Sequence, residues 1–91
     1  MKYKYMEFFT EHTKVEISEL KHDDSVFGGQ KVIVYFINTL TNAKGTAMLP
    51  TYEWLDKGKL FKNDIAFCNE LLHTNNGLIF RDAREGGLPI A

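Results

Sequence analysis

The stretch Lys31–Pro50, KVIVYFINTLTNAKGTAMLP, decides the fold of this chain. Its first part, residues 32–37, is an unbroken run of β-branched, aliphatic and aromatic side chains, which fit a pleated strand and lose χ1 freedom in a helix. Because the run is apolar on both alternating sides, it predicts a central strand that is covered on both faces. It is too short to span a membrane as a helix, which requires about 20 apolar residues.

A tight turn and a return strand follow this run. The segment 42–45, with the sequence NAKG, predicts the turn, because Asn suits the first position of a type I turn and Gly can take the left-handed conformation. Residues 46–49 are then expected to pair back toward Leu40 and Ile37. Pro50 ends the strand, since it has no N–H to donate. The stretch therefore predicts a β-hairpin at the centre of the scaffold.

The N-terminal third predicts a second hairpin. Residues 2–9 and 13–17 alternate polar and apolar side chains, which indicates two strands. A turn near residues 11–12 would join them. A helix over residues 6–20 is the competing interpretation, and the β-branched side chains in this segment weigh against it. Residues 22–29 predict a loop.

The segment after Pro50 predicts short helices. Thr51 is a plausible N-cap for a helix over residues 52–57, and Gly58 would end it. Asn63 is a second N-cap candidate. The apolar positions that follow it at helical spacing, and that we expect in the core, are Ile65, Cys68, Leu71 and Leu72.

The last part of the chain allows two interpretations. The sequence Asn75-Asn76-Gly77 predicts the end of the second helix. Residues 78–80 fit either a final strand or a further helix through Arg84, and the helix is favoured because residues 83–85 continue it well. We therefore expect a single α+β domain over residues 1–87 and a short apolar tail over residues 88–91. Its antiparallel sheet of about four strands would come from the N-terminal half and be packed by two or three short C-terminal helices.

The composition is that of one small globular domain. The chain has 91 residues, of which 44% are hydrophobic and 25% are charged, which is ordinary for a folded protein. Its formal net charge of −1 argues against a strongly basic nucleic-acid binder. The single cysteine, Cys68, cannot form an internal disulfide, and no apolar segment follows Lys2 and Lys4 in the manner of a secretory signal. Both features favour a cytoplasmic location.

The sequence contains no pattern that indicates catalysis. The donors His22, Asp23 and Asp24 are adjacent, and neighbours in sequence do not converge on one metal ion. Cys68 lies on the apolar stripe of its predicted helix, which indicates a small core residue rather than a nucleophile. We therefore expect no catalytic residues, no metal site and no cofactor, and a non-enzymatic protein is favoured.

Two groups of residues remain as candidate binding residues. The first is an interaction patch that mixes aromatic and lysine side chains: Tyr52, Trp54, Lys57, Lys59, Phe61 and Lys62. Such a patch can form a protein-binding hot spot, or it can stack bases and contact phosphate. Alternatively, Trp54 and Phe61 pack the first helix onto the sheet. The second group, Arg81 and Arg84, could grip an anion from one helix face or form surface ion pairs with neighbouring acids.

These features predict a small interaction or regulatory module that binds another protein, without a membrane partner. A nucleic-acid-binding module that uses the aromatic–lysine patch is the first alternative, and a small-ligand binder or minor enzyme is the second. A homodimer through a sheet edge is also expected, because small domains often cover open edges by pairing them. The candidate edges are residues 2–9 and 46–49.

Overall fold

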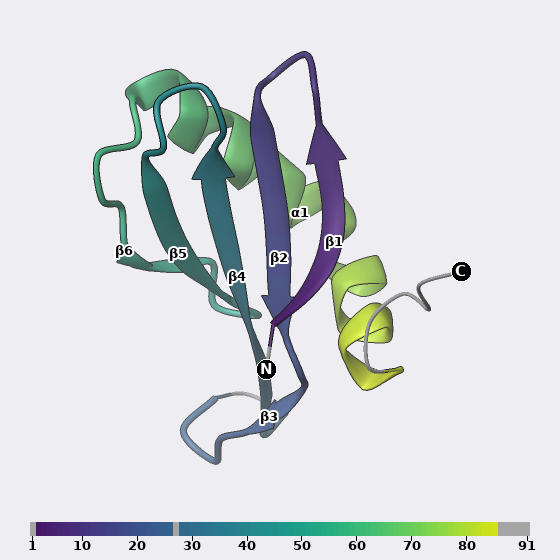
Figure 1. Ribbon diagram of the computed structural model, residues 1–91. Helices are drawn as coiled ribbons and strands as arrows, with labels where there is room; N and C mark the ends of the chain where they lie inside the picture. The colour runs from purple at the N-terminus through teal and green to yellow at the C-terminus, as the bar shows by residue number, and fades with distance from the viewer. Residues whose placement is uncertain (1, 27, 86–91) are drawn as a thin grey trace.

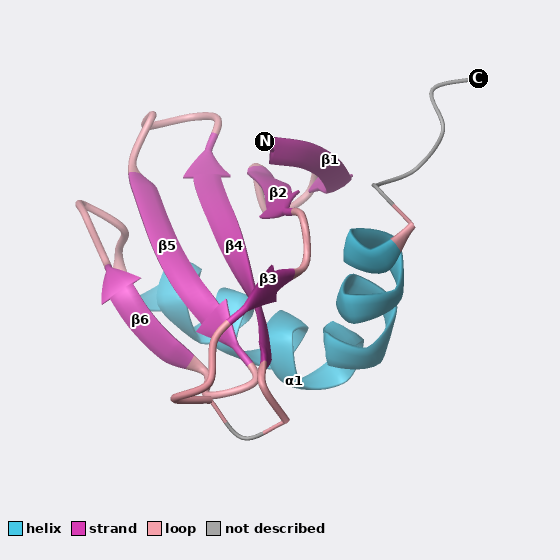
Figure 2. Cartoon of the chain, turned by 90° about the horizontal axis from the view of Figure 1, so that it is seen from below, coloured by secondary structure: helices cyan, strands magenta, loops and turns pink. Residues whose placement is uncertain are grey.

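The chain folds as an antiparallel sheet with a helix packed against one face (Figures 1 and 2). The computed structural model describes residues 2–26 and 28–85. Its elements are β1 (Lys2–Phe8), β2 (Thr13–Ser18), β3 (Lys21–His22), β4 (Gln30–Asn38), β5 (Lys44–Leu49), β6 (Glu53–Asp56) and α1 (Lys62–Arg84). The α+β class is as predicted, but the expected counts are wrong, because the described residues form six strands and one helix. The predicted tail over residues 88–91 lies outside the described residues.

The predicted central hairpin is confirmed. Strands β4 and β5 pair antiparallel, with Val32 opposite Leu49 and Ile37 opposite Lys44. The return strand therefore begins before residue 46 and pairs with β4 rather than with Leu40. In the sheet order β1-β2-β4-β5-β6, β4 is the middle strand, as its long apolar run predicts.

The turn of this hairpin differs from the predicted one. Asn42 itself takes the left-handed conformation, with φ of 62°, and its N–H donates to the Asn38 carbonyl. Asn tolerates this conformation better than most residues. Gly45 lies inside β5, where a Cβ would meet the side chains of Leu60 and Trp54. This glycine is therefore needed for close packing rather than for the turn.

The N-terminal hairpin is also confirmed, and the helix over residues 6–20 is excluded. Strands β1 and β2 pair antiparallel, and His12 closes their turn with φ of 52°. Strand β2 then pairs with β4, with Val15 opposite Phe36. Part of the predicted 22–29 loop forms the short strand β3, which pairs with the start of β4.

The helix predicted over residues 52–57 is wrong, because this segment forms β6. Tyr52 has φ of 60°, which no helical residue adopts. Trp54 then pairs with Ala47 of β5. The open edges of the five-strand order are thus β1 and β6, so the prediction that residues 46–49 form an edge is wrong.

Helix α1 is one bent helix rather than two short ones. It runs through Asn75-Asn76-Gly77, so residues 78–84 are helical, as favoured. Figures 1 and 2 show its C-terminal part turned away from the direction of the first part. Thr74 Oγ1 donates to the Glu70 and Leu71 carbonyls, and Asn75 Nδ2 donates to the Leu71 carbonyl. Side chains that bond to helix carbonyls in this way commonly bend a helix.

The core lies between the sheet and α1. The fully buried apolar side chains are Val15, Ile17, Val32, Val34, Phe36, Ala47, Leu49, Cys68, Leu72 and Ile79. Among residues 2–26 and 28–85, α1 covers only one face of β4 (Figure 2), so the predicted cover on both faces is not found there. No helix in the described chain combines the length and apolar character needed to cross a membrane.

Candidate functional site

The structure divides the predicted interaction patch into two groups. Tyr52 and Trp54 are half-buried against α1, whereas Lys57, Lys59, Phe61 and Lys62 are exposed. The exposed group lies on the segment that leads from β6 into α1. The six predicted residues therefore differ in exposure, and the lysines and Phe61 are the more accessible part of the predicted patch.

Tyr52 and Trp54 attach β6 to the helix. The Tyr52 ring stacks on the His73 ring at 3.9 Å between centroids, and its hydroxyl accepts a hydrogen bond of 2.6 Å from Asn76 Nδ2. Trp54 Nε1 donates to Asn69 Oδ1 at 2.8 Å. The Trp54 ring also packs on the Phe36 ring, with centroids 5.5 Å apart. Both rings have structural partners, which favours the packing interpretation for Trp54.

The most exposed large apolar side chains lie on three loops at one end of the sheet. They are Phe9 in the β1–β2 turn, Leu40 in the β4–β5 turn and Phe61 before α1, with exposed fractions of 77%, 72% and 65%. We call these three residues the apolar end. Phe9 and Leu40 were missed in the sequence analysis. Leu40 could have been recognised as a candidate binding residue, because it is a large apolar residue among the polar residues of a turn.

One polar pair, formed by buried Asn38 and half-buried Asp64, fixes two members of the apolar end. Asn38 is 8% exposed, and its Oδ1 accepts hydrogen bonds from the N–H groups of Leu40 and Thr41. Its Nδ2 donates to Asp64 Oδ1 at 3.1 Å, while Asp64 Oδ2 accepts from the Phe61 N–H at 3.1 Å. The Asn38–Asp64 pair thus links the backbones that carry Leu40 and Phe61.

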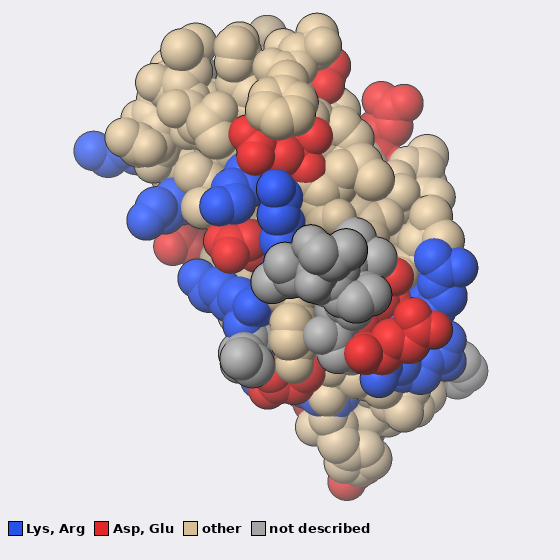
Figure 3. All heavy atoms as spheres, turned by 45° about the vertical axis from the view of Figure 1, so that its right-hand side comes forward, with Lys and Arg blue, Asp and Glu red and all other residues tan. Residues whose placement is uncertain are grey.

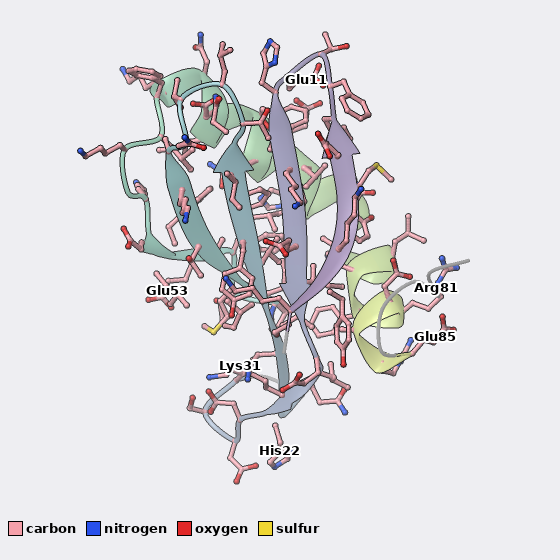
Figure 4. All side chains as sticks on the ribbon, viewed as in Figure 1. Glu11, His22, Lys31, Glu53, Arg81 and Glu85 are labelled. Atoms are coloured by element: carbon pink, nitrogen blue, oxygen red, sulfur yellow. The ribbon has the colours of Figure 1, made fainter. Side chains whose placement is uncertain are left out.

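The loop of Phe9 is attached to the same end. The Thr39 N–H donates to the His12 carbonyl at 2.7 Å, and the His12 N–H donates to the Phe9 carbonyl at 3.2 Å. Three loops from distant parts of the sequence are therefore held together by hydrogen bonds. Figure 4 shows Glu11 at this end of the β1–β2 hairpin, and the corresponding region of Figure 3 is largely uncharged.

Lysine side chains accompany Phe61 at this end. Lys57, Lys59 and Lys62 are exposed, and Lys44 is exposed at the start of β5. Gly58 lies directly against the Lys44 backbone, which places the 57–61 segment beside β5. The nearby Asp56 carboxylate accepts a hydrogen bond from the Gly58 N–H.

The structure gives the two arginines different neighbours, and their shared anion contact stays a prediction. Arg81 Nε lies 3.7 Å from Oδ1 of the buried Asp82, which is one of the ion pairs considered as the alternative. Arg84 instead lines an open cavity of about 290 Å³ together with Gly28, Gln30, Pro50 and Phe80. Figure 4 shows Arg81 near the C-terminal end of α1.

The remaining candidate groups have structural partners. Asp23 accepts hydrogen bonds from Lys31 Nζ and from the Ser25 hydroxyl, and these bonds lower the pKa of its carboxyl. His22 Nε2 lies 2.8 Å from Asp24 Oδ1 in an exposed pair. Across the part of the chain that the structure describes, no three His, Cys, Asp or Glu side chains are grouped closely enough to hold a metal ion.

Cys68 is fully buried in the core, as its place on the apolar stripe predicts. Burial, with a smaller contribution from Asp64, raises the pKa of its thiol to about 12. Because only the thiolate is nucleophilic, we expect Ellman's reagent at pH 8 to label native Cys68 very slowly and to label it at once in guanidinium. Rapid stoichiometric labelling of the native protein would contradict this burial.

Comparison of the chain with known protein families, with curated proteins and with solved structures finds no match.

Proposed function

We propose that this protein is a non-enzymatic binding module that docks onto another protein through its apolar end. The observation that carries the proposal is the exposure of Phe9, Leu40 and Phe61 on three loops joined by hydrogen bonds. The exposed lysines of the predicted patch, Lys57 and Lys59 among them, would lie at the rim of this surface.

Physical arguments support a binding role for these side chains. Burying a large apolar side chain in an interface contributes about 1.5–3 kcal/mol, and aromatic anchors are enriched among hot-spot residues. The hydrogen bonds of Asn38, Asp64 and Thr39 hold the loops before any partner arrives. Such preorganisation lowers the entropic cost of binding.

The charges indicate the chemistry of the partner. The lysines near Phe61 favour a partner with an apolar depression surrounded by Asp and Glu. Opposite charges at an interface rim mainly raise the association rate, and salt screens this effect. We therefore expect the association rate to fall as salt increases, while the dissociation rate depends on the apolar side chains.

Phe61→Asp is the sharpest test of the proposed function. Phe61 is the N-cap of α1, and Asp is a favoured N-cap residue, so the fold should be retained. Partners captured by the wild-type protein would be purified and titrated by calorimetry. The variant is expected to bind at least about 10-fold more weakly, which corresponds to about 1.4 kcal/mol.

Leu78→Asp is the matched control, because Leu78 is 45% exposed and lies on the C-terminal part of α1. It should leave the affinity unchanged. Equal affinity of Phe61→Asp and the wild-type protein for every purified partner would contradict the proposal.

Nucleic-acid binding is the second candidate, and the exposed Lys57, Lys59 and Lys62 support it. It is weakened because Tyr52 and Trp54, the expected stacking platforms, contact α1. Anisotropy titrations of labelled single-stranded DNA and RNA at low salt distinguish the candidates, because phosphate binding weakens steeply with salt. The small-ligand binder or minor enzyme, the other alternative predicted from the sequence, stays a prediction. The cytoplasmic location remains a prediction.

A further inference from the structure

The sheet has an open face, which is the face opposite α1 (Figures 1 and 2). Along the central strand β4, Val32, Val34 and Phe36 are fully buried. The alternating positions Ile33, Tyr35 and Ile37 therefore lie on the open face, because successive side chains of a strand point to opposite faces.

The open face carries an apolar stripe along its middle. Ile33, Tyr35 and Ile37 form it, and Met48 of β5 lies directly opposite Ile33. Within the described chain these side chains are shielded only by their neighbours in the sheet and are half-buried. An apolar sheet face of this kind normally packs against a second layer.

Two rows of residues cross the open face with opposite charges at their two ends. The first row contains, in order across the sheet, Lys2, Ser18, Ile33, Met48 and Glu53. Ser18 and Ile33 are joined by a hydrogen bond from the Ile33 N–H to the Ser18 hydroxyl. This row therefore begins with a lysine on β1 and ends with a glutamate on β6, and Ile33 is at its centre.

The second row repeats this arrangement. Its members, in order across the sheet, are Lys4, Glu16, Tyr35, Thr46 and Asp56. Again a lysine lies on β1, an acid lies on β6, and a β4 residue of the apolar stripe is at the centre. The charged ends of both rows are thus complementary about the line of β4, and Lys4 also lies 3.9 Å from Glu7 of the same strand.

We propose that two copies of this chain pack open face against open face, about a two-fold axis that runs along β4. Because β4 is the middle of the five-strand order, this axis lays β1 of one copy over β6 of the other. Lys2 then faces Glu53 of the second copy, and Lys4 faces Asp56. The apolar stripes meet at the axis, as in the sheet-on-sheet packing of β-sandwiches.

The size of the open face suits a dimer. The molecule measures 35 × 33 × 22 Å, and Figure 1 views one of its broad faces. The broad side of the molecule, of which the open face is a part, is thus wide enough for the roughly 800 Å² that each partner buries in a standard stable interface. A third row runs from Glu7 through Lys14 and Ile37 to Lys44. The two-fold axis would bring Lys14 of one copy toward Lys44 of the other, and these like charges repel each other. The closest contact between the copies is therefore centred on Ile33 and Tyr35.

The charge pattern favours a second copy over a nucleic acid as the occupant. Lysines and acidic residues are mixed across the open face, whereas a phosphate backbone requires a predominantly positive surface. In the single chain Lys2 Nζ lies over the Tyr35 ring, 4.3 Å from its centroid. The proposed dimer requires this side chain to turn away from β4, toward Glu53 of the second copy.

Sedimentation equilibrium of the full chain tests this proposal. We expect twice the mass of one chain at roughly 0.1 mM, a concentration above the micromolar Kd of weak interfaces of this size. Lys2→Glu and Glu53→Lys should each weaken the dimer about 5-fold or more. The double variant should restore the wild-type Kd. It exchanges the positive and the negative charge at both symmetry-related contacts, so that each contact again joins a lysine to a glutamate.

Glu70→Lys is the matched control, since Glu70 is exposed on α1, on the opposite side of the sheet. It should leave the Kd unchanged, and circular dichroism should show the same fold for all variants. A monomer at this concentration overturns the proposal and leaves the open face to a different partner. A dimer that is insensitive to both charge changes, or that is lost with Phe61→Asp, overturns it as well.

Discussion

Phe36→Ala is expected to lower the free energy of unfolding by about 3–5 kcal/mol, a large part of the stability of a small domain. Phe36 is fully buried at the middle of β4 and packs on the Trp54 ring. Truncating a buried phenylalanine to alanine costs about 3–5 kcal/mol, and small domains have a total stability of only about 5–15 kcal/mol. Urea denaturation followed by circular dichroism gives the free energy of unfolding directly.

Leu40→Ala is the comparison for this variant, because Leu40 is 72% exposed. Its free energy of unfolding should stay within about 0.5 kcal/mol of the wild-type value. A similar loss in both variants would mean that the apolar end is part of the core, and it would also remove the basis of the proposed function.

Gly58→Ala is expected to lower the free energy of unfolding by about 2 kcal/mol or more. Gly58 has φ of 54°, and an added Cβ would overlap the Lys44 carbonyl oxygen. The substitution therefore combines backbone strain with a collision against β5, whose backbone cannot move without breaking sheet hydrogen bonds. Thermal and urea unfolding of the purified variant measure the loss.

Gly77→Ala should have the opposite sign. Gly77 lies inside α1, and nothing lies within 4 Å of an added Cβ. Alanine in a helix interior is favoured over glycine by about 0.5–1 kcal/mol. If both variants were destabilised equally, the contact of Gly58 with Lys44 would not be the cause.

Local patterns predicted the strands of the N-terminal half well. The apolar run of β4 and the alternation in β1 and β2 each lie within one short segment. The predicted geometry of the β4–β5 turn was wrong, as was the loop assigned to part of β3. Helical spacing also predicts Ile65, Cys68, Leu71 and Leu72 in the core. The last three are buried, whereas Ile65 is only half-buried. In these segments local preference and tertiary packing favour the same structure.

The segment after Pro50 was mispredicted because distant contacts decide it. A strand at residues 53–56 is stabilised by its ladder with β5 and by the bond from Trp54 to Asn69. Neither contact is visible in the local sequence, which suits a short helix. Likewise, Asn75-Asn76-Gly77 is a strong stop signal, yet packing of Leu72 and Ile79 into one core keeps the helix continuous through it.

The candidate site likewise has residues that the sequence predicts and residues that only distant contacts bring together. Phe61, Lys57, Lys59 and Lys62 were found from composition, and they are exposed. Only the hydrogen bonds of Asn38, Asp64 and Thr39 link the loops of Phe9 and Leu40 to that of Phe61. Three loops that are far apart in the chain cannot be assigned to one surface from their separate sequences.

The sequence by itself determined the α+β class, the central hairpin of β4 and β5, and the buried positions Cys68, Leu71 and Leu72, because side-chain periodicity records which face of an element avoids water. Tertiary structure alone decided that β6 is a strand, that α1 is a single bent helix and that the open face of β4 has no covering layer in the described chain. It also decided which exposed side chains gather at the apolar end. These outcomes depend on contacts between residues distant in sequence, and their free energies exceed the small local preferences that opposed them.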